Sequence, residues 1–529
     1  MESSRVQYRL KRGLFAAWLV AICAFALLHA LHLNADFPNH TPWHSDWAKY
    51  TDEGWYGNAA MRERLFGHWY VPGDFTPAPQ LPLWPALEWV VFGVAGVSLH
   101  SARALAVALF FVNLGLSYLL LRRDGQRWRA LLALTLAVTS PFLYAFSRLA
   151  ILEPLLTTLT LAALNVAVRL PRLRRPVMAA AGIGLLFTAM MLTKTTAVFL
   201  LPALMWAMVL PLRGRWKTAL GCVGAAGAAA AATYGGWLAL LARTGYMEDY
   251  HYLIFINTYE KPQQWWWPAL SFWWSFHGGL WVDHILVPLA GVLALAALVC
   301  WPMRWSRALR LEPLFGASVL AVMGYIGFMT VQNHPQPRYY AVVAVFCFFL
   351  VALGAAAVAG QVGTARKLGW AVVVLAAGAA IANAAWTISF AAFPEYTFVT
   401  AARSLTRYID EHPNGKRLLV SISGDEITME THIPSLCDDF GTTPLERKLA
   451  QYQPGWYAAW NDLDPGTLAD IHTHFSLEQV ATFRAFDDPE RNVLVLFKLH
   501  PLPRGHVRDE GDMDLQGQLP GDRFTIPIE

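Results

Sequence analysis

The chain has 529 residues, of which 56% are hydrophobic and only 15% are charged, whereas about 25% of a soluble domain is charged. Many apolar runs approach or exceed the ~18 residues that suggest a bilayer span, and they do not alternate as barrel strands would. The composition excludes an ordinary soluble protein and predicts a polytopic α-helical membrane protein.

Charge is distributed unevenly along the chain. Residues 395–529 hold 12 Lys and Arg against 22 Asp and Glu, and the remainder holds 29 against 15. This asymmetry does not suggest nucleic-acid binding; it predicts basic cytoplasmic loops and a separate acidic domain. We therefore expect a transmembrane domain over residues 1–394 and a small periplasmic α/β domain over residues 395–529. The five cysteines show neither a disulfide framework nor metal-ligand spacing.

Basic clusters determine the expected topology of the membrane domain. If the spans alternate, these clusters and the N-terminus can all face the cytoplasm: 5–12, 122–129, 169–175, 213–217, 304–310 and 366–367. This topology requires about eleven transmembrane helices, near residues 13–33, 101–121, 129–147, 154–170, 177–193, 196–212, 218–242, 285–302, 312–331, 339–360 and 368–392.

The broken apolar run at residues 83–99 contains Pro85 and Glu88. Counting it as a span would place the next basic cluster outside. We therefore expect an interfacial or re-entrant helix of the first outer loop here, with an ordinary span as the alternative.

A polar stretch at residues 43–58 opens the first outer loop and concentrates carboxylates, a histidine and aromatic residues. Asp52 and Glu53 precede a predicted helix. Asp52 can act as a general base, which contributes roughly 10²–10⁴ in rate, or it can simply cap that helix. His44, Trp55 and Tyr56 are candidate substrate contacts in the same stretch.

The other ionisable candidates fall in turns on the same predicted side of the membrane. Arg148 and Glu153 flank one turn, Lys194 interrupts a long apolar stretch, and Arg338-Tyr339 begins a late span. Charge at membrane depth costs ~2.5–3.5 kcal/mol and usually marks function, and a guanidinium suits a phosphate. The alternatives are interfacial placement, snorkelling and anchoring of a helix end.

Two further segments complete the outer side. The loop at residues 243–284 is rich in tryptophan and contains His277, a further candidate substrate contact. Membrane anchoring would explain its composition, and so would stacking on a sugar ring or cradling a lipid chain. In the tail, residues 417–422 and 492–497 are predicted strands, and residues 477–486 are a predicted helix.

These motifs, in this order, resemble the GT-C membrane glycosyltransferases. Asp-Glu in the first outer loop is followed by Ser-Arg-Leu-x-x-x-acid, Leu-Thr-Lys and a late Arg-Tyr. The nearest relatives are expected in glycosyltransferase family 39, which includes protein O-mannosyltransferases and bacterial lipid A aminoarabinose transferases. The resemblance covers residues 1–392 and implies a GT-C fold with membrane-lying helices in the first outer loop.

The resemblance also implies roles for the candidates. Asp52 matches the catalytic base, Glu153 stands in place of a second aspartate, and Lys194 and the Arg338-Tyr339 pair match donor-site positions. We include Glu53 among the catalytic candidates and Arg148 among the donor-phosphate candidates. Two cations of the aminoarabinose transferases are missing, because Trp55 replaces an arginine and residues 80–83 read Gln-Leu-Pro-Leu.

The expected function is that of an inverting glycosyltransferase, hexosyl or pentosyl, using a polyprenyl-phosphate sugar. The acceptor is a hydroxyl of a lipid, glycan or protein at the periplasmic face of a bacterial inner membrane. A transporter or lipid flippase and a non-catalytic scaffold are the alternatives, but the span centres are almost bare of ionisable groups. No cofactor is expected, although residues 44, 46, 52 and 53 could supply ligands to a divalent metal.

Overall fold

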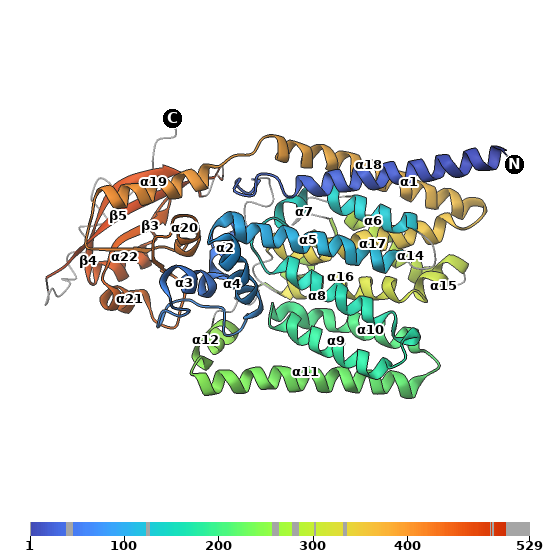
Figure 1. Cartoon of the computed structure of the whole chain (residues 1–529), viewed down its shortest axis with the longest axis horizontal. Coiled ribbons are helices and arrows are strands. Elements are labelled where there is room, and N and C mark those ends of the chain that lie inside the picture. Colours follow the sequence, from blue (N-terminus) through green and yellow to red (C-terminus); the bar gives the residue numbers. More distant parts are fainter. Residues whose placement is uncertain are drawn as a thin grey trace.

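The computed structural model describes residues 2–38, 46–122, 127–256, 264–277, 285–300, 303–331, 336–486, 488 and 491–503. A helical bundle and a domain built on a β-sheet lie end to end along the long axis (Figure 1). The short helices of the first loop lie between these two parts, next to the sheet domain (Figure 1).

The bundle is formed by long apolar helices and their shorter neighbours. They are α1 (Glu2–Leu28), α5 (Leu99–Leu121), α6 (Arg127–Thr139), α7 (Pro141–Phe146), α8 (Glu153–Ala167), α9 (Pro176–Met191), α10 (Leu201–Val209), α11 (Trp216–Thr244), α14 (Leu286–Val299), α15 (Arg304–Arg310), α16 (Pro313–Val331), α17 (Tyr340–Ala359) and α18 (Gly363–Ala392). Short helical turns join them: η4 (Leu170–Arg172), η5 (Thr195–Leu200), η6 (Leu210–Leu212) and η8 (Pro337–Tyr339).

Within the described residues, six helical stretches are long and apolar enough to cross a membrane, or seven if α14 and α15 form one span. They are Leu99–Leu121, Thr195–Leu212, Trp216–Thr244, Pro313–Val331, Pro337–Ala359 and the stretch beginning at Gly363. The other expected spans also contain helices, but their apolar parts are shorter than the 18 residues required. The chain is a multi-pass membrane protein, and the count of eleven spans stays a prediction.

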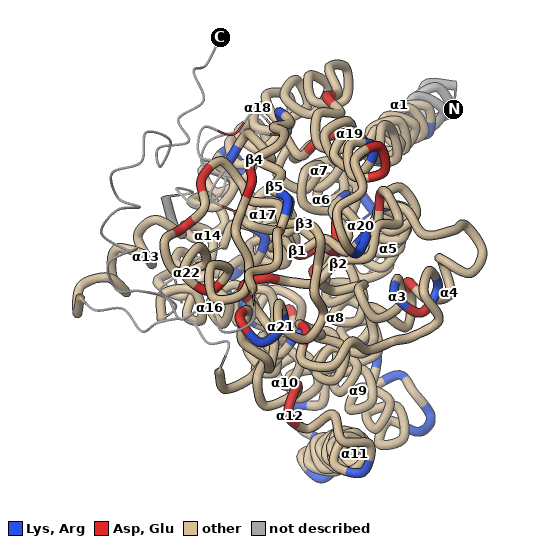
Figure 2. Tube along the Cα trace, turned by 90° about the vertical axis from the view of Figure 1, so that its left-hand side faces the viewer, with Lys and Arg blue, Asp and Glu red and all other residues tan. Residues whose placement is uncertain are grey.

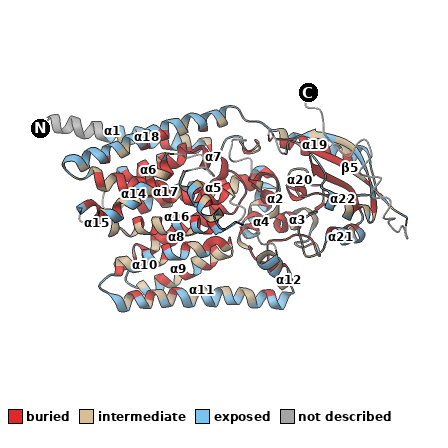
Figure 3. Ribbon diagram, turned by 180° about the vertical axis from the view of Figure 1, so that it is seen from behind, coloured by how far each residue is buried: buried red, intermediate tan, exposed pale blue. Residues whose placement is uncertain are grey.

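Exposure along the helices separates the centre of the bundle from its surface. α17 is buried along most of its length, whereas α11 and α18 carry long exposed apolar faces (Figure 3). Exposed apolar helix faces are the surfaces that lipid chains cover. α17 is therefore the central helix, and its N-terminal end is next to Arg338 and Tyr339.

The first loop forms four short helical segments: η2 (Trp47–Lys49), α2 (Asp52–Trp55), α3 (Asn58–Phe66) and α4 (Leu83–Ala95). α4 has 13 residues, ends at Gly96 in a non-helical conformation, and lies beside α3 at the sheet-facing end of the bundle (Figure 1). α4 is shorter than a membrane span, and its placement along the membrane stays a prediction. The later loop contains α12 (Met247–His251), η7 (Tyr252–Ile256) and α13 (Trp267–His277).

The C-terminal domain is a five-stranded mixed sheet of order β2-β1-β3-β5-β4. Its elements are α19 (Thr397–Glu411), β1 (Lys416–Val420), α20 (Gly424–Thr431), β2 (Ser435–Leu436), α21 (Leu445–Tyr452), β3 (Pro454–Trp460), α22 (Pro465–His472), β4 (Phe475–Arg484) and β5 (Val493–Pro501). β1 pairs in parallel with β2 and β3, and β5 pairs antiparallel with β3 and β4. The predicted strands at 417–422 and 492–497 are confirmed.

The helix predicted at residues 477–486 is wrong, because this segment is strand β4. A register shift between Gln479 and Ala481 interrupts its pairing with β5. Such a bulge adds one residue and breaks the alternation of a strand. As a result, the apolar residues Leu477, Val480 and Ala481 acquire the i, i+3, i+4 spacing typical of a helix.

Candidate active site

Two acidic residues of the first loop converge on one arginine of the bundle. Asp46 is the N-cap of η2, and its Oδ1 accepts a hydrogen bond from the Ala48 main-chain N–H at 2.8 Å. Arg338 Nη1 lies 2.7 Å from Asp46 Oδ1, and the Arg338 main-chain N–H donates to Asp46 Oδ2 at 2.7 Å. Arg338 Nε lies 2.9 Å from Asp52 Oδ2. All three side chains are buried, so the site is a closed ion cluster.

Asp52 is the first residue of α2, and Thr51 is the N-cap residue. Thr51 makes no side-chain capping hydrogen bond; its hydroxyl instead donates to the main-chain oxygen of Trp47 at 3.1 Å. Side-chain capping, the alternative that the sequence left open for Asp52, is therefore not the role of its carboxylate. The Asp52 carboxylate is directed to Arg338 instead.

A second ion pair adjoins the first. Lys194, the residue before η5, forms a buried salt bridge with Glu153, the first residue of α8. The Tyr339 ring lies between two cations, with its centroid 4.2 Å from Lys194 Nζ and 5.2 Å from the guanidinium carbon of Arg338. The structure thus brings five predicted site residues together: Asp52, Glu153, Lys194, Arg338 and Tyr339.

The surroundings of Asp52 favour its protonated form. Burial raises the pKa of this carboxyl, and the Asp46 and Glu153 carboxylates raise it further, whereas Arg338 and Lys194 lower it. A carboxylate with a raised pKa is a stronger base once ionised. The cluster therefore combines a strengthened base with two neighbouring cations.

Two predicted site residues, Glu53 and Arg148, make contacts away from Arg338. Glu53 accepts two hydrogen bonds from Arg103, at 2.7 Å and 2.5 Å, and a third from the Ala150 main-chain N–H at 2.8 Å. Arg148 donates to the main-chain oxygens of Leu31 and His32. These contacts support structural roles for Glu53 and Arg148, and the structure does not bring Arg148 to the Arg338 cluster.

The predicted substrate contacts differ in their placement. Trp55 Nε1 donates to the main-chain oxygen of Ile422 in the C-terminal domain at 3.2 Å, and its ring packs against Phe75 and Phe440. Tyr56 is half-buried and packs against an apolar cluster shared by the first loop and the C-terminal domain. His44 and the side chain of His277 lie outside the described residues.

Sequence reasoning missed several members of this region. Asp46 was considered only as a metal ligand, although its place in the polar stretch was a usable signal. Arg103 was missed as the partner of Glu53, although a lone cation near the start of an apolar helix is a signal in itself. Asp425 and Glu426 lie more than 350 residues from α2 in the sequence, and no local pattern connected them to it.

The carboxylates of the described part of the chain do not form an evident metal centre. No group of three or more His, Cys, Asp or Glu side chains is placed there to hold a metal ion. Asp46 and Asp52 would be suitable oxygen ligands, but both face Arg338. The site is thus a group of buried ion pairs in which Arg338 faces Asp46 and Asp52 and Lys194 faces Glu153.

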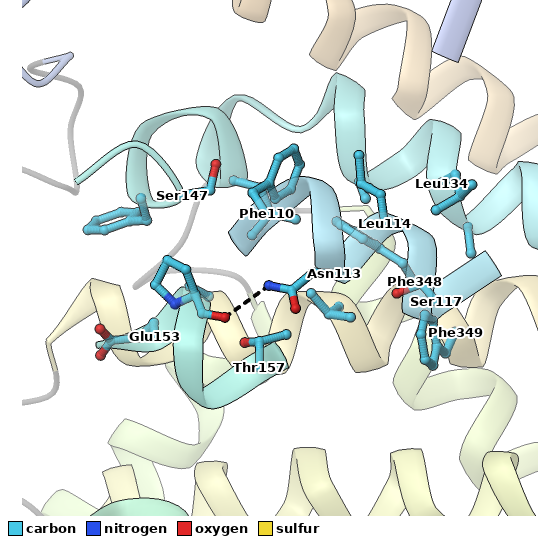
Figure 4. A pocket seen from close by; sticks show the side chains of 17 residues that line it. Phe110, Asn113, Leu114, Ser117, Leu134, Ser147, Glu153, Thr157, Phe348 and Phe349 are labelled. Atoms are coloured by element: carbon cyan, nitrogen blue, oxygen red, sulfur yellow. Dashed lines mark hydrogen bonds between the residues drawn. The ribbon is translucent and has the colours of Figure 1, made fainter. Parts of the chain in front are cut away.

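A small cavity of about 30 Å³ lies in the bundle among α5, α6, α8 and α17. Its walls are mostly apolar, with Phe110, Leu134, Phe348 and Phe349 among the lining residues. Glu153 lies at one end of this group of side chains (Figure 4). Asn113, on the wall, donates a hydrogen bond to the Pro154 main-chain oxygen at 3.0 Å (Figure 4). The ion cluster therefore adjoins an apolar space within the membrane part.

Comparisons with known proteins concern the family and the fold of the chain. A family model described as dolichyl-phosphate-mannose-protein mannosyltransferase matches residues 77–237. No protein in a search of curated sequences matches the chain.

The structure of ArnT from Cupriavidus metallidurans bound to undecaprenyl phosphate is similar, with 13% identity and a TM-score of 0.61 over 91% of this chain and 98% of that one. The Archaeoglobus fulgidus oligosaccharyltransferase is also similar, with 13% identity and a TM-score of 0.51 over 93% of this chain and 75% of that one. The chain therefore has the GT-C fold of membrane glycosyltransferases, and its residues 77–237 match the dolichyl-phosphate-mannose-protein mannosyltransferase family.

Proposed function

We propose that this chain is an inverting glycosyltransferase that moves a hexosyl or pentosyl group from a polyprenyl phosphate to an acceptor hydroxyl. The acceptor is a lipid, glycan or protein. The reaction takes place at the membrane face that carries the C-terminal domain, which we assign to the periplasmic side of a bacterial inner membrane. The observation that carries the proposal is the buried contact between Asp52 and Arg338, beside Lys194 and Tyr339.

The proposed chemistry is a single displacement. Asp52 accepts the proton of the acceptor hydroxyl, and the acceptor oxygen attacks the anomeric carbon of the sugar. The bond from that carbon to the phosphate oxygen breaks, and the electron pair leaves with the polyprenyl phosphate. Arg338 and Lys194 stabilise the charge that develops on this phosphate. One displacement inverts the anomeric centre, and the proton on Asp52 is later released to water.

Two further observations support a lipid-linked donor. The side chains that line the small cavity beside Glu153 are mostly apolar, as contact with isoprenoid units requires, and a lipid chain along them would bring its phosphate near Lys194. The similar ArnT structure is described as bound to undecaprenyl phosphate. We therefore assign Lys194, Arg338 and Tyr339 to the phosphate end of the donor and the apolar side chains beside Glu153 to the first part of its chain.

Asp52→Asn tests the proposal. The purified variant should bind a polyprenyl-phosphate sugar as the wild type does but transfer it roughly 10²–10⁴ times more slowly, because only the base is lost. A panel of hexosyl and pentosyl donors, with incorporation into an acceptor fraction as the measurement, identifies the sugar. Asp410→Asn, at an exposed ion pair with Arg417, is the matched control and should leave the rate unchanged. An Asp52→Asn protein with the wild-type rate would contradict the assignment of the base.

A further inference from the structure

The C-terminal domain reaches the helix that carries Asp52. α20 packs directly on α2, and the two helices lie side by side (Figure 1). At Gly54 a Cβ atom would lie 2.3 Å from the main-chain nitrogen of Glu426 and 2.5 Å from the main-chain carbon of Asp425. Real Cβ atoms do not approach main-chain atoms so closely, so this contact requires glycine. The two backbones therefore meet two residues after the proposed base.

Buried polar contacts hold the first loop against α20 and α21 of the C-terminal domain. Asp425 accepts hydrogen bonds from Asn58 Nδ2 and from Arg62 Nη2, each at 3.0 Å. Arg62 also bonds Asp74 at 2.6 Å, and Lys448 bonds Asp74 at 3.1 Å. α3 and α21 carry charged residues of both signs, whereas those of α20 are all acidic (Figure 2). Breaking one partner of such a buried network leaves an uncompensated charge, so the network holds α20 against α2 and α3.

Glu426 lies on α20, the helix that packs against α2. The side chain is buried, with 1% of its surface exposed. The main-chain N–H of Glu53 faces the Glu426 carboxyl, but neither oxygen reaches hydrogen-bond geometry with a partner among the described residues. The charged groups that act on it are Glu53 and Asp52 from α2 and Arg103 from α5. On α20 itself, Glu430 pairs with Arg403 of α19 and is one turn away.

We propose that Glu426 of the C-terminal domain is a positioning residue of the transfer reaction, holding α2 so that Asp52 stays beside Arg338. The inference rests on the proposed role of Asp52. α2 has only four residues, and a helix of that length has no stability of its own, so its packing partners determine its place. α20 supplies one of these partners, and Arg103 supplies another through Glu53.

The charge state of Glu426 gives this role a measurable signature. Burial raises the pKa of Glu426 well above its usual range; Glu53 and Asp52 raise it further, whereas Arg103 lowers it. The neutral acid packs beneath α2 without repelling the two carboxylates above it. Ionisation would add a third negative charge and compete with Glu53 for Arg103. We therefore expect the transfer rate to fall at alkaline pH as Glu426 ionises.

The test compares three variants of the full-length enzyme in one transfer assay. Glu426→Gln imitates the neutral acid, so it should keep the wild-type kcat at neutral pH and lose the alkaline fall. Glu426→Ala leaves a space beneath α2 and should lower kcat on the order of 100-fold with an unchanged KM for the donor, the size expected for a displacement of about 1 Å. Glu430→Gln, on the same helix, should behave as the wild type.

Two outcomes would overturn the inference. One is a Glu426→Gln enzyme that keeps the alkaline fall of the wild type. The other is a Glu426→Ala enzyme with wild-type kcat, or with a raised donor KM alone. Asp52→Asn, measured beside them, separates this inference from the proposed function: if it transfers normally, the function fails, whereas an inactive Asp52→Asn with unaffected Glu426 variants removes only the positioning role.

Discussion

Asp46 holds Arg338 at two points, through the guanidinium and through the main-chain N–H, each at 2.7 Å. The same Asp46 carboxylate raises the pKa of Asp52, whose shift is caused first by burial and is opposed by Arg338. Asp46 therefore controls both the orientation of the cation and the strength of the proposed base. This double role leads to the first prediction.

Asp46→Asn should move the acid limb of the pH–rate profile to lower pH. The proposed base must be ionised to act, and removing a neighbouring negative charge lowers its pKa. The limiting rate should also fall, because a base with a lower pKa accepts a proton less readily. The measurement is kcat against pH, with Asp410→Asn as the control. A limb that stays in place, or moves to higher pH, would contradict the link between the two carboxylates.

Arg338→Lys should weaken donor binding more than it slows transfer at saturating donor. Lysine keeps the positive charge but lacks the planar guanidinium that contacts Asp46 and Asp52 at once. We expect a donor half-saturation raised roughly 10-fold, because each 1.4 kcal/mol lost in binding is tenfold. Arg417→Lys, at the exposed pair with Asp410, is the control. An unchanged half-saturation point would argue against a phosphate contact at this position.

Arg103→Met should destabilise the fold. It leaves the buried Glu53 carboxylate without its two-point partner, and breaking a buried pair costs about 3–5 kcal/mol. Thermal unfolding in detergent should show a clearly lower Tm. The double variant Glu53→Gln with Arg103→Met should recover part of the loss, because no charge is then left unpaired. Equal Tm values for the wild type and Arg103→Met would exclude a structural role for this pair.

Asp438→Asn should stabilise the protein much more at pH 7.5 than at pH 4.5. Burial raises the pKa of Asp438 to about 6, although a hydrogen bond from the Tyr457 hydroxyl at 2.7 Å lowers it. The folded state thus binds this proton more tightly than the unfolded state, and stability is lost as the pH rises from about 4, the usual pKa of an aspartate, through the folded pKa of about 6. Each pKa unit corresponds to about 1.4 kcal/mol, so the gain at pH 7.5 should be roughly 3 kcal/mol.

The measurement for Asp438→Asn is denaturant unfolding at both pH values. The exposed Asp410 provides the comparison, because the Arg417 hydrogen bond lowers its pKa. Asp410→Asn should therefore gain no stability at the higher pH. A stability gain for Asp438→Asn that is the same at pH 4.5 and pH 7.5 would show that charge is not its cause.

Much of the membrane part could be predicted, because apolar length and basic loops depend on local sequence. The predicted side of the membrane was enough to group Asp52, Lys194 and Arg338, because every second turn between spans lies at the same end of a helical bundle. The individual ion pairs could not be predicted in this way. Arg103 is the partner of Glu53 because of three-dimensional packing, which no local pattern in the sequence reports. Trp55 likewise packs on the C-terminal domain, and nothing in its neighbouring sequence indicates that contact.

The contacts of the first loop also determine the order in which the protein can mature. Its residues leave the ribosome early, yet Asp46 and Asp52 need Arg338, Gly54 needs Glu426, and Lys49 forms a buried salt bridge with Asp488 at 2.8 Å. Chains are synthesised at about 5–20 residues per second from the N-terminus. The first loop therefore lacks a partner until Asp488 has been translated. A ribosome that stalls early would release a membrane-inserted product without activity.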